Sequence, residues 1–149
     1  MTVWIPSGPS LSEPLDKVSF SQMARVSGSG GVSLSAVNDL QFGPEKAPVF
    51  LWPEPQDTVW IRYDFPDEEE FSATGVYWYT SDSKPPNDWK ILALVEGEWH
   101  AVYNYLKPWG TEPGMMNRVL FETVRTRSLR LEVRKEPGQQ CGVIEWEVD

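Results

Sequence analysis

The stretch from Thr58 to Phe65 constrains the fold of this chain more than any other, because its side chains alternate strictly in character. The apolar set is Val59, Ile61, Tyr63 and Phe65, and the intervening set is Thr58, Trp60, Arg62 and Asp64. A period of two is typical of a β-strand with one buried face. A strand of this kind needs a second sheet to cover its apolar side, so the pattern predicts a layered β protein.

The charged segment that follows predicts an interruption of this strand. Pro66 has no amide hydrogen to donate to a sheet, and the acidic run Asp67–Glu70 favours contact with water. A second strand-like run, rich in aromatic and β-branched residues, extends from Phe71 to Thr80. We therefore expect the two runs to be separate strands that form a hairpin.

Similar runs recur along the rest of the chain, separated by turn-forming residues. Short first strands are expected between residues 16 and 29, a hairpin from 89–95 and 99–105, a further pair from 117–124 and 128–135, and a last strand at 143–148. Thirteen Pro and eleven Gly leave no room for a long helix. The pattern predicts an all-β fold of about eight strands, an antiparallel β-sandwich or jelly roll, with a closed barrel as the weaker alternative.

Charge and composition limit which kinds of partner the protein can bind and where in the cell it can be found. The net charge of −9 disfavours binding to nucleic acid or to an anionic membrane surface, and no apolar run approaches the length of a membrane span, about 20 residues. The opening residues 1–15 are rich in Pro and Ser and predict a lead-in or linker, with the domain at 16–149. The start carries no signal peptide, which leaves either a cytoplasmic protein or a piece of a longer secreted chain; the opening favours the second.

No group of residues predicts a reaction. The single histidine, His100, lies on a strand without a nucleophile pattern nearby, and Cys141 lies in a turn without a neighbouring base. Glycosidases use two carboxylates, but 22 acidic residues in 149 place some pairs close together by chance. An independent hydrolase is therefore disfavoured.

Acidic loop residues raise the question of calcium, which prefers carboxylate and carbonyl oxygen ligands. Asp39 lies in an irregular segment and could form a site with Glu145 or Glu147 from the last strand. The alternative is that both glutamates are exposed to solvent on the polar face of that strand.

The tryptophans fall into two groups. Those on strands are expected in the core or on sheet faces, whereas Trp52 and Trp109 lie in loops rich in proline. An exposed indole can stack on the apolar face of a sugar ring while polar neighbours bind the hydroxyl groups. Asn87, Asn117 and Arg118 lie at loops or loop edges and can supply those hydrogen bonds. The alternative is that both tryptophans close the ends of the sandwich.

Short motifs spread over residues 20–149 carry a family resemblance. They are Val37-Asn38-Asp39, Trp52-Pro53, Val59–Phe65, Val76–Tyr79, Trp89–Leu92, Glu98-Trp99, Asn117–Glu122, Leu129–Val133 and Gly142–Trp146. In these motifs the chain resembles the C-terminal accessory β-sandwich of bacterial glycoside hydrolases related to β-L-arabinofuranosidases. It is similar more broadly to galactose-binding-like jelly rolls of the discoidin and factor V/VIII C type.

The resemblance implies a non-catalytic ancillary domain in a larger secreted or periplasmic glycoside hydrolase, next to a catalytic domain. It implies oligosaccharide or polysaccharide binding through loops at one end, which points to Trp52 and Trp109, and a structural calcium ion at Asp39 and Glu145. The alternative is a purely structural domain that packs against the catalytic domain and binds no sugar.

Overall fold

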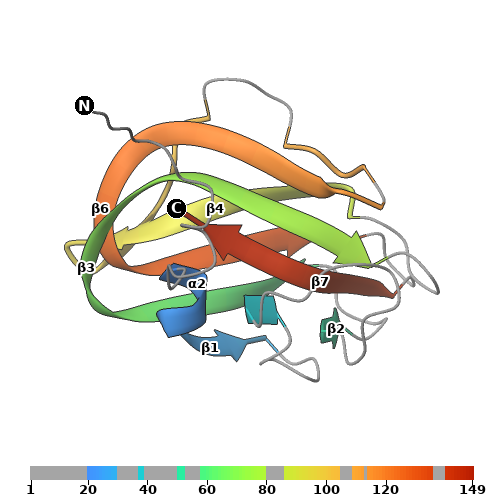
Figure 1. Ribbon diagram of the computed structural model, residues 1–149, viewed down its shortest axis with the longest axis horizontal. Helices are drawn as coiled ribbons and strands as arrows, with labels where there is room; N and C mark the ends of the chain where they lie inside the picture. Colours follow the sequence, from blue (N-terminus) through green and yellow to red (C-terminus); the bar gives the residue numbers. More distant parts are fainter. Residues whose placement is uncertain are drawn as a thin grey trace, which may run out of the picture.

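Two long strands, β3 (Thr58–Tyr79) and β6 (Met116–Arg134), run antiparallel to each other through the whole of the computed structural model. Both strands bend sharply at one end of the molecule, at the left in Figure 1, and return on the other side. The structure describes residues 20–29, 37–38, 50–52, 58–79, 86–104, 109–112, 114–135 and 140–149. Within these residues the two bent strands join the two layers of a sandwich.

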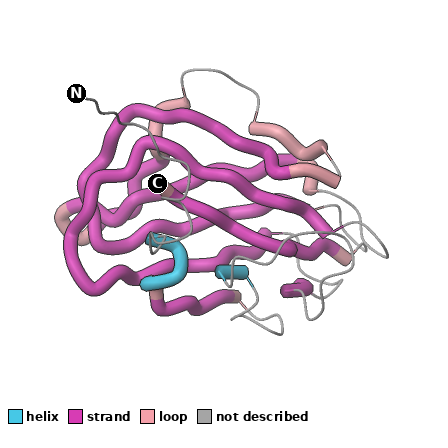
Figure 2. Tube along the Cα trace, viewed as in Figure 1, coloured by secondary structure: helices cyan, strands magenta, loops and turns pink. Residues whose placement is uncertain are grey.

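The other elements are short and pair with the two long strands or with each other. They are α2 (Phe20–Met23), β1 (Arg25–Gly28), β2 (Phe50–Trp52), β4 (Asp88–Val95), β5 (Glu98–Ala101) and β7 (Cys141–Val148). The first layer holds β1, the first half of β3, the second half of β6, β4 and β5; the second holds β2, β7 and the remaining halves of β3 and β6. All pairings are antiparallel and strands dominate the trace (Figure 2), so the all-β sandwich predicted from the sequence is confirmed.

The expected hairpin between Thr58 and Thr80 is wrong, and so is the expected pair at 117–124 and 128–135. Each pair of runs is one continuous strand that changes layers. The two bends stay hydrogen-bonded to each other, with Glu69 opposite Thr126 and Glu70 opposite Arg125. The extra residues between Asp64 and Glu69 form a bulge, where the missing amide hydrogen of Pro66 costs no sheet hydrogen bond.

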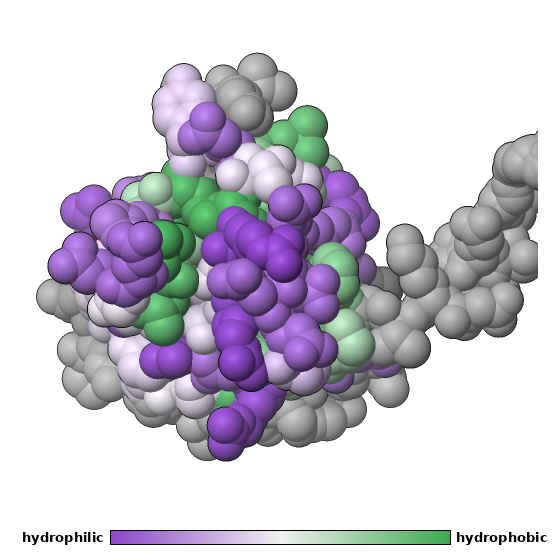
Figure 3. Space-filling view, turned by 90° about the vertical axis from the view of Figure 1, so that its left-hand side faces the viewer, coloured by the Kyte–Doolittle hydropathy of each residue, from purple (hydrophilic) through white to green (hydrophobic). Residues whose placement is uncertain are grey.

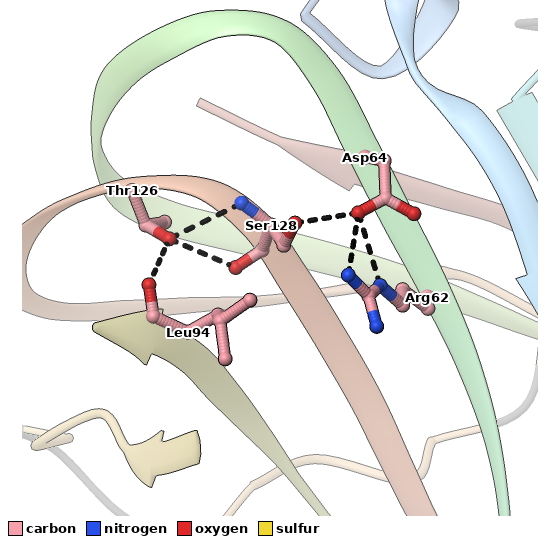
Figure 4. Close-up of polar contacts among 5 residues, drawn as sticks. All are labelled: Arg62, Asp64, Leu94, Thr126 and Ser128. Atoms are coloured by element: carbon pink, nitrogen blue, oxygen red, sulfur yellow. Dashed lines mark hydrogen bonds and ion pairs between the residues drawn. The ribbon is translucent and has the colours of Figure 1, made fainter. Parts of the chain in front are cut away.

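Polar side chains fix the strands where they enter the bend (Figure 4). The Ser128 hydroxyl donates to the Asp64 carboxylate at 2.5 Å, which ties β6 to β3. The Thr126 hydroxyl donates to the carbonyl of Leu94 at 2.6 Å and accepts from the Ser128 amide at 3.1 Å. These contacts link the bend of β6 to the end of β4 and so set the register of three strands.

Charged residues cover the outside of the bend. Arg125 lies 3.0 Å from the carboxylate of Glu68, and Arg127 donates to the carbonyl of Pro66 at 2.6 Å. Figure 3 looks onto this end and shows a band of hydrophilic residues across it. The acidic run that predicted a turn is therefore solvent-exposed, as its chemistry requires.

The hairpin expected around residues 96–98 is confirmed. Strands β4 and β5 pair from Leu92–Ala101 to Val95–Glu98 and are joined by Glu96 and Gly97. Both joining residues have positive φ, 52° and 81° respectively. Two consecutive left-handed residues form the tight turn whose twist matches an antiparallel hairpin. The last predicted strand is confirmed as β7.

The apolar side chains of the alternating stretch Thr58–Phe65 form the centre of the core. Val59, Ile61 and Tyr63 have no exposed surface. The Tyr63 ring stacks on Trp146 of β7 with centroids 3.9 Å apart, and its hydroxyl donates to the Trp146 carbonyl at 2.6 Å. The same hydroxyl lies 3.2 Å from the carbonyl of Val37. One side chain thus joins the first layer, the second layer and the turn at Val37.

No helix among the described residues is long and apolar enough to cross a membrane. The expected lead-in at residues 1–15 lies outside the described residues.

We expect Tyr63→Phe to lower the free energy of unfolding by about 1–2 kcal/mol, because two buried carbonyl groups lose a hydroxyl donor while the ring stacking is kept. Chemical denaturation followed by tryptophan fluorescence measures the change. Tyr103→Phe, at a side chain that is 61% exposed, is the matched control and should change stability by less than about 0.5 kcal/mol. Equal effects of the two substitutions would contradict this role for Tyr63.

Candidate ligand-binding surfaces

The ends of the strands opposite the bend form the first candidate surface, which we call the loop end. Strands β4, β6 and β7 begin there and β3 ends there, at the right in Figure 1. Three tryptophans gather at this end. Trp78 and Trp89 meet edge to face with centroids 5.7 Å apart, and Trp89 meets Trp109 in the same way at 4.9 Å.

The carbonyl of Gly110 holds this tryptophan cluster together. It accepts hydrogen bonds from the indole nitrogen of Trp89 at 2.7 Å and from that of Trp78 at 3.3 Å. Because these two indoles belong to β4 and β3, which lie in different layers here, one loop carbonyl joins both layers. These two hydrogen bonds from buried indoles therefore hold the segment at 109–112 against the core.

The two loop tryptophans predicted to stack on sugar differ in exposure. Trp109 is partly buried and packs against the core, so the residue keeps some exposed surface. Trp52 has no exposed surface and lies on β2 opposite Cys141. The alternative of a tryptophan that closes the sandwich therefore describes Trp52 in this structure, and Trp109 retains surface for a ligand.

Asn117, predicted to bind sugar hydroxyls, instead organises the loop before β6. It is 5% exposed. Its carbonyl oxygen accepts from the Glu112 amide at 2.9 Å. Its amide nitrogen lies 2.9 Å from the carbonyl of Glu112, 3.1 Å from that of Met115 and 3.2 Å from that of Val76. Both polar atoms of the side chain are engaged inside the protein, so its position serves the loop rather than a ligand.

The backbone of Gly110 lies very close to the side chain of Asn117. A Cβ atom at Gly110 would lie 2.7 Å from the Asn117 side-chain oxygen, closer than real contacts allow. Only glycine therefore allows the Gly110 carbonyl to reach the two indoles while Asn117 closes the loop.

The two other predicted sugar contacts lie apart from each other. Asn87 is exposed at the loop end, next to the start of β4, and its backbone amide donates to the Arg134 carbonyl at 2.9 Å. Arg118 lies on the outer face of the second layer, where it pairs with Glu147 at 3.1 Å. The structure thus places Asn87 at the loop end and Arg118 near the start of β6, with its side chain on the outer face of the second layer.

The predicted calcium ligands are described only in part. Glu145 has no exposed surface, and a buried carboxylate requires a cation or hydrogen-bond donors beside it. Asp39 lies outside the described residues. Within the described residues, no group of three or more His, Cys, Asp or Glu side chains is placed to hold a metal ion. Calcium binding therefore stays a prediction.

Cys141 is buried beside the loop end. Burial raises the pKa of its thiol to about 12, although Lys135 and the amide of Gly142 act in the lowering direction. The thiol is therefore protonated at neutral pH, which is unfavourable for a nucleophile.

A second candidate surface lies on the outer face of the first layer. Four side chains meet there, and we call them the two-arginine face: Trp60 and Arg62 of β3, Trp99 of β5 and Arg130 of β6. The Arg130 guanidinium lies 5.2 Å from the Trp60 ring centroid and 5.5 Å from that of Trp99. The Arg62 guanidinium lies 5.1 Å from the Trp99 centroid. Both indoles are partly exposed, unlike Trp78, Trp89 and Trp146.

The sequence alone predicts no role for this face, although one pattern in it indicates that the face is exposed. The alternation from Thr58 to Phe65 places Trp60 and Arg62 on the side that faces solvent. An indole on the polar side of a half-buried strand is exposed by its position. Trp99 comes from another strand, and its contact with Arg62 and Arg130 depends on the tertiary arrangement.

No protein-family model and no curated protein matches the sequence. Solved structures do match the fold. A structure from work on the Streptococcus pneumoniae β-galactosidase BgaA superposes with a TM-score of 0.74 and 16% identity, covering 89% of this chain and 94% of that one.

Two further matches are binding modules by description. Chitosan-binding module 1 from a Paenibacillus sp. IK-5 chitosanase/glucanase has a TM-score of 0.68 and 14% identity, covering 89% of this chain and 99% of that one. CpGH89CBM32-5 from Clostridium perfringens, in complex with GalNAc-β-1,3-galactose, has a TM-score of 0.70 and 9% identity, covering 87% of this chain and 96% of that one. At these identities the similarity shows the fold.

We expect Asn117→Ala to lower the free energy of unfolding by about 1–3 kcal/mol, because the Glu112 amide and several loop carbonyls lose their partner. Asn87→Ala, at an exposed asparagine, should change it by less than about 0.5 kcal/mol. Thermal and urea unfolding of both variants measure the difference. An Asn117→Ala protein of wild-type stability would show that the loop does not depend on this amide.

Proposed function

We propose that this chain is a non-catalytic ancillary domain of a glycoside hydrolase and that it binds carbohydrate at the loop end. The observation that carries the proposal is Trp109, a partly exposed indole held edge-on against Trp89 at 4.9 Å where the strands end. An indole fixed in orientation loses little freedom when a sugar ring stacks on it. The likeness in fold to modules described as binding chitosan and GalNAc-β-1,3-galactose supports this reading.

Polar groups beside Trp89 can bind the hydroxyl groups of such a ligand. A shallow groove of about 110 Å³ at the start of β4 is lined by Thr58, Asp88, Trp89, Lys90, Glu132 and Arg134. The exposed Asn87 precedes this groove in the chain. A groove this small, whose lining does not include Trp109, favours weak binding.

The second candidate function is a purely structural domain that packs against a catalytic domain and binds no sugar. The burial of Trp52 and the internal role of Asn117 favour it, since two of the predicted ligand contacts serve the fold itself. The two functions differ in what Trp109 does. A docking domain uses it against protein, and a binding module uses it against a sugar.

The same proposal places the domain in a longer secreted or periplasmic enzyme, with a catalytic domain as its partner. The narrower relation to enzymes related to β-L-arabinofuranosidases stays a prediction.

We expect the isolated domain to bind at least one member of a panel of arabinose-containing, galactose-containing and chitosan oligosaccharides. Trp109→Ala should weaken that binding at least about tenfold, equivalent to about 1.4 kcal/mol of lost stacking. Isothermal titration calorimetry and tryptophan fluorescence measure the affinity. Tyr103→Ala, at an exposed aromatic residue away from the loop end, is the matched control. Sugar binding that is unchanged by Trp109→Ala would contradict the site, and a flat response to the whole panel would favour the structural function.

The proposal also includes a structural calcium ion bound with the help of Glu145 and Asp39. Calcium should raise the melting temperature of the domain after EDTA treatment, because a ligand that binds only the folded state stabilises it. Glu145→Gln should remove the calcium-dependent rise, and Glu122→Gln, at an exposed glutamate, should retain it. A melting temperature independent of calcium would contradict the metal site.

A further inference from the structure

We propose that the two-arginine face is a second ligand site and that its ligand is an acidic oligosaccharide, whose pyranose rings carry carboxylate groups. The inference rests on the proposed function in that the ligand is again a carbohydrate, but it uses a different surface and a different chemistry. The site comprises Trp60, Arg62, Trp99 and Arg130, together with the groove between β1 and β3.

Two arginines lie directly opposite each other at the centre of this face. Arg62 on β3 pairs in register with Arg130 on β6. Like charges at directly opposed positions of an antiparallel pair destabilise a sheet. Asp64 beside Arg62 and Glu132 beside Arg130 offset part of this repulsion. An anionic ligand bound across both arginines would add a counter-charge between them.

The indoles orient the two guanidinium groups. Trp99 lies close to both of them, at 5.1 Å and 5.5 Å from ring centroid to guanidinium carbon, and Trp60 contacts Arg130 from the other side. Arginine stacks on aromatic faces while its planar N–H groups stay available for a carboxylate. The stacking thus fixes the orientation of the donors in the free protein.

Nearby carboxylates use only part of the donor capacity. The Oδ1 of Asp64 lies 3.0 Å from Nε and 2.9 Å from Nη2 of Arg62, and Glu132 accepts from one terminal nitrogen of Arg130 at 2.8 Å. Glu132 also lies 3.6 Å from Lys90 and so shares its charge between two cations. The Arg62 and Arg130 side chains are 34% and 25% exposed. Each guanidinium has five N–H donors, so both retain donors for a ligand.

The charge balance of the face is opposite to that of the chain. Among the residues that the structure describes, strand alternation and register place these charged residues on the outer side of the first layer: Arg25, Arg62, Lys90, Arg130, Arg134, Asp64, Asp88 and Glu132. The list holds five cations and three carboxylates, a balance of +2 on a chain whose net charge is −9. A locally positive surface on an acidic protein complements an anion rather than a neutral ligand.

A groove beside Trp60 has room for a sugar ring. It measures about 280 Å³, is open to solvent, and is lined by Arg25, Val26, Ser27, Trp60, Arg62 and Asp64. The indole of Trp60 offers apolar surface to the C–H face of a ring. Arg25 and Arg62 offer donors to its carboxylate, and Ser27 and Asp64 offer partners for its hydroxyl groups. Aromatic, cationic and hydrogen-bonding groups thus occur in one groove, as an acidic sugar requires.

The test compares a galacturonate oligosaccharide with the neutral galactose oligosaccharide of the same length, by titration calorimetry on the whole chain. We expect the acidic ligand to bind wild-type protein and to bind Arg130→Gln at least about tenfold more weakly. Arg130→Gln leaves Glu132 next to Lys90. Arg118→Gln is the matched control, because it removes the same charge from the outer face of the second layer, and it should leave binding unchanged.

Two additional variants, Arg130→Lys and Trp99→Ala, test the proposal if Arg130→Gln folds poorly. Arg130→Lys retains the charge without the planar fork and should bind with intermediate affinity. Trp99→Ala should weaken acidic binding, whereas Trp109→Ala should not. Binding should also fall as sodium chloride rises, because the contacts are ionic and exposed.

The outcomes separate this proposal from the loop-end site. Acidic binding lost in Trp109→Ala and retained in Arg130→Gln would overturn the second site and leave the loop-end site standing. Acidic binding lost in Arg130→Gln, with neutral sugars unbound, would support the second site and remove the first. Absence of acidic binding would overturn the second site. Equally tight, Arg130-dependent binding of poly-glutamate would overturn the choice of a sugar, since charge alone would then be recognised.

Discussion

The pairing of β3 with β6 through a shared bend is the constraint on which the rest of the structure depends. Hydrogen-bonded backbone here crosses from one layer to the other. Ser128 and Asp64 fix the register before the bend, and Glu69 opposite Thr126 keeps it within the bend. A slip of one residue would turn Tyr63 away from Trp146 and expose the core face of both strands. The bend therefore specifies which side chains are inside.

The same constraint divides the surface into regions of different use. The bend end is closed by continuous strands and covered by charged pairs such as Arg125 with Glu68. The opposite end collects the loops, and a loop end is where irregular backbone can present side chains to a ligand. Its contacts are costly to rearrange, because the Gly110 carbonyl holds Trp78 and Trp89 and Asn117 closes the loop above them. Trp109 is thus presented on a rigid base, which is a requirement for a small binding site with few contacts.

Local patterns in the sequence predicted the strands and their buried faces, but they did not predict connectivity at the bends. Pro66 and the acidic run after it have the chemistry of a turn. That they lie in a bulge of a continuous strand depends on β6, whose residues are distant in sequence. The positions of Trp52 and Asn117 also depend on tertiary contacts that local sequence patterns do not show. A loop tryptophan and a loop-edge asparagine are consistent with ligand contacts until the structure shows that one is covered and the other bonds its own loop. Trp60, by contrast, was already on the solvent side of its strand, and the packing argument for strand tryptophans obscured that signal.

The two candidate surfaces would bind through different interactions, and the net charge of the chain affects only one of them. At the loop end an indole and neutral or mixed polar groups favour a neutral sugar, whose affinity is insensitive to salt. The two-arginine face lies on a protein of charge −9, but charges farther from the ligand than the Debye length, about 8–10 Å at physiological ionic strength, are largely screened. Attraction by Arg62 and Arg130 therefore acts only at contact. Stacking on Trp60 and Trp99 must supply the remaining affinity, because screening removes most long-range attraction. An acidic ligand without a stacking ring would lack that contribution, and for this reason the face fits a sugar acid better than a simple anion.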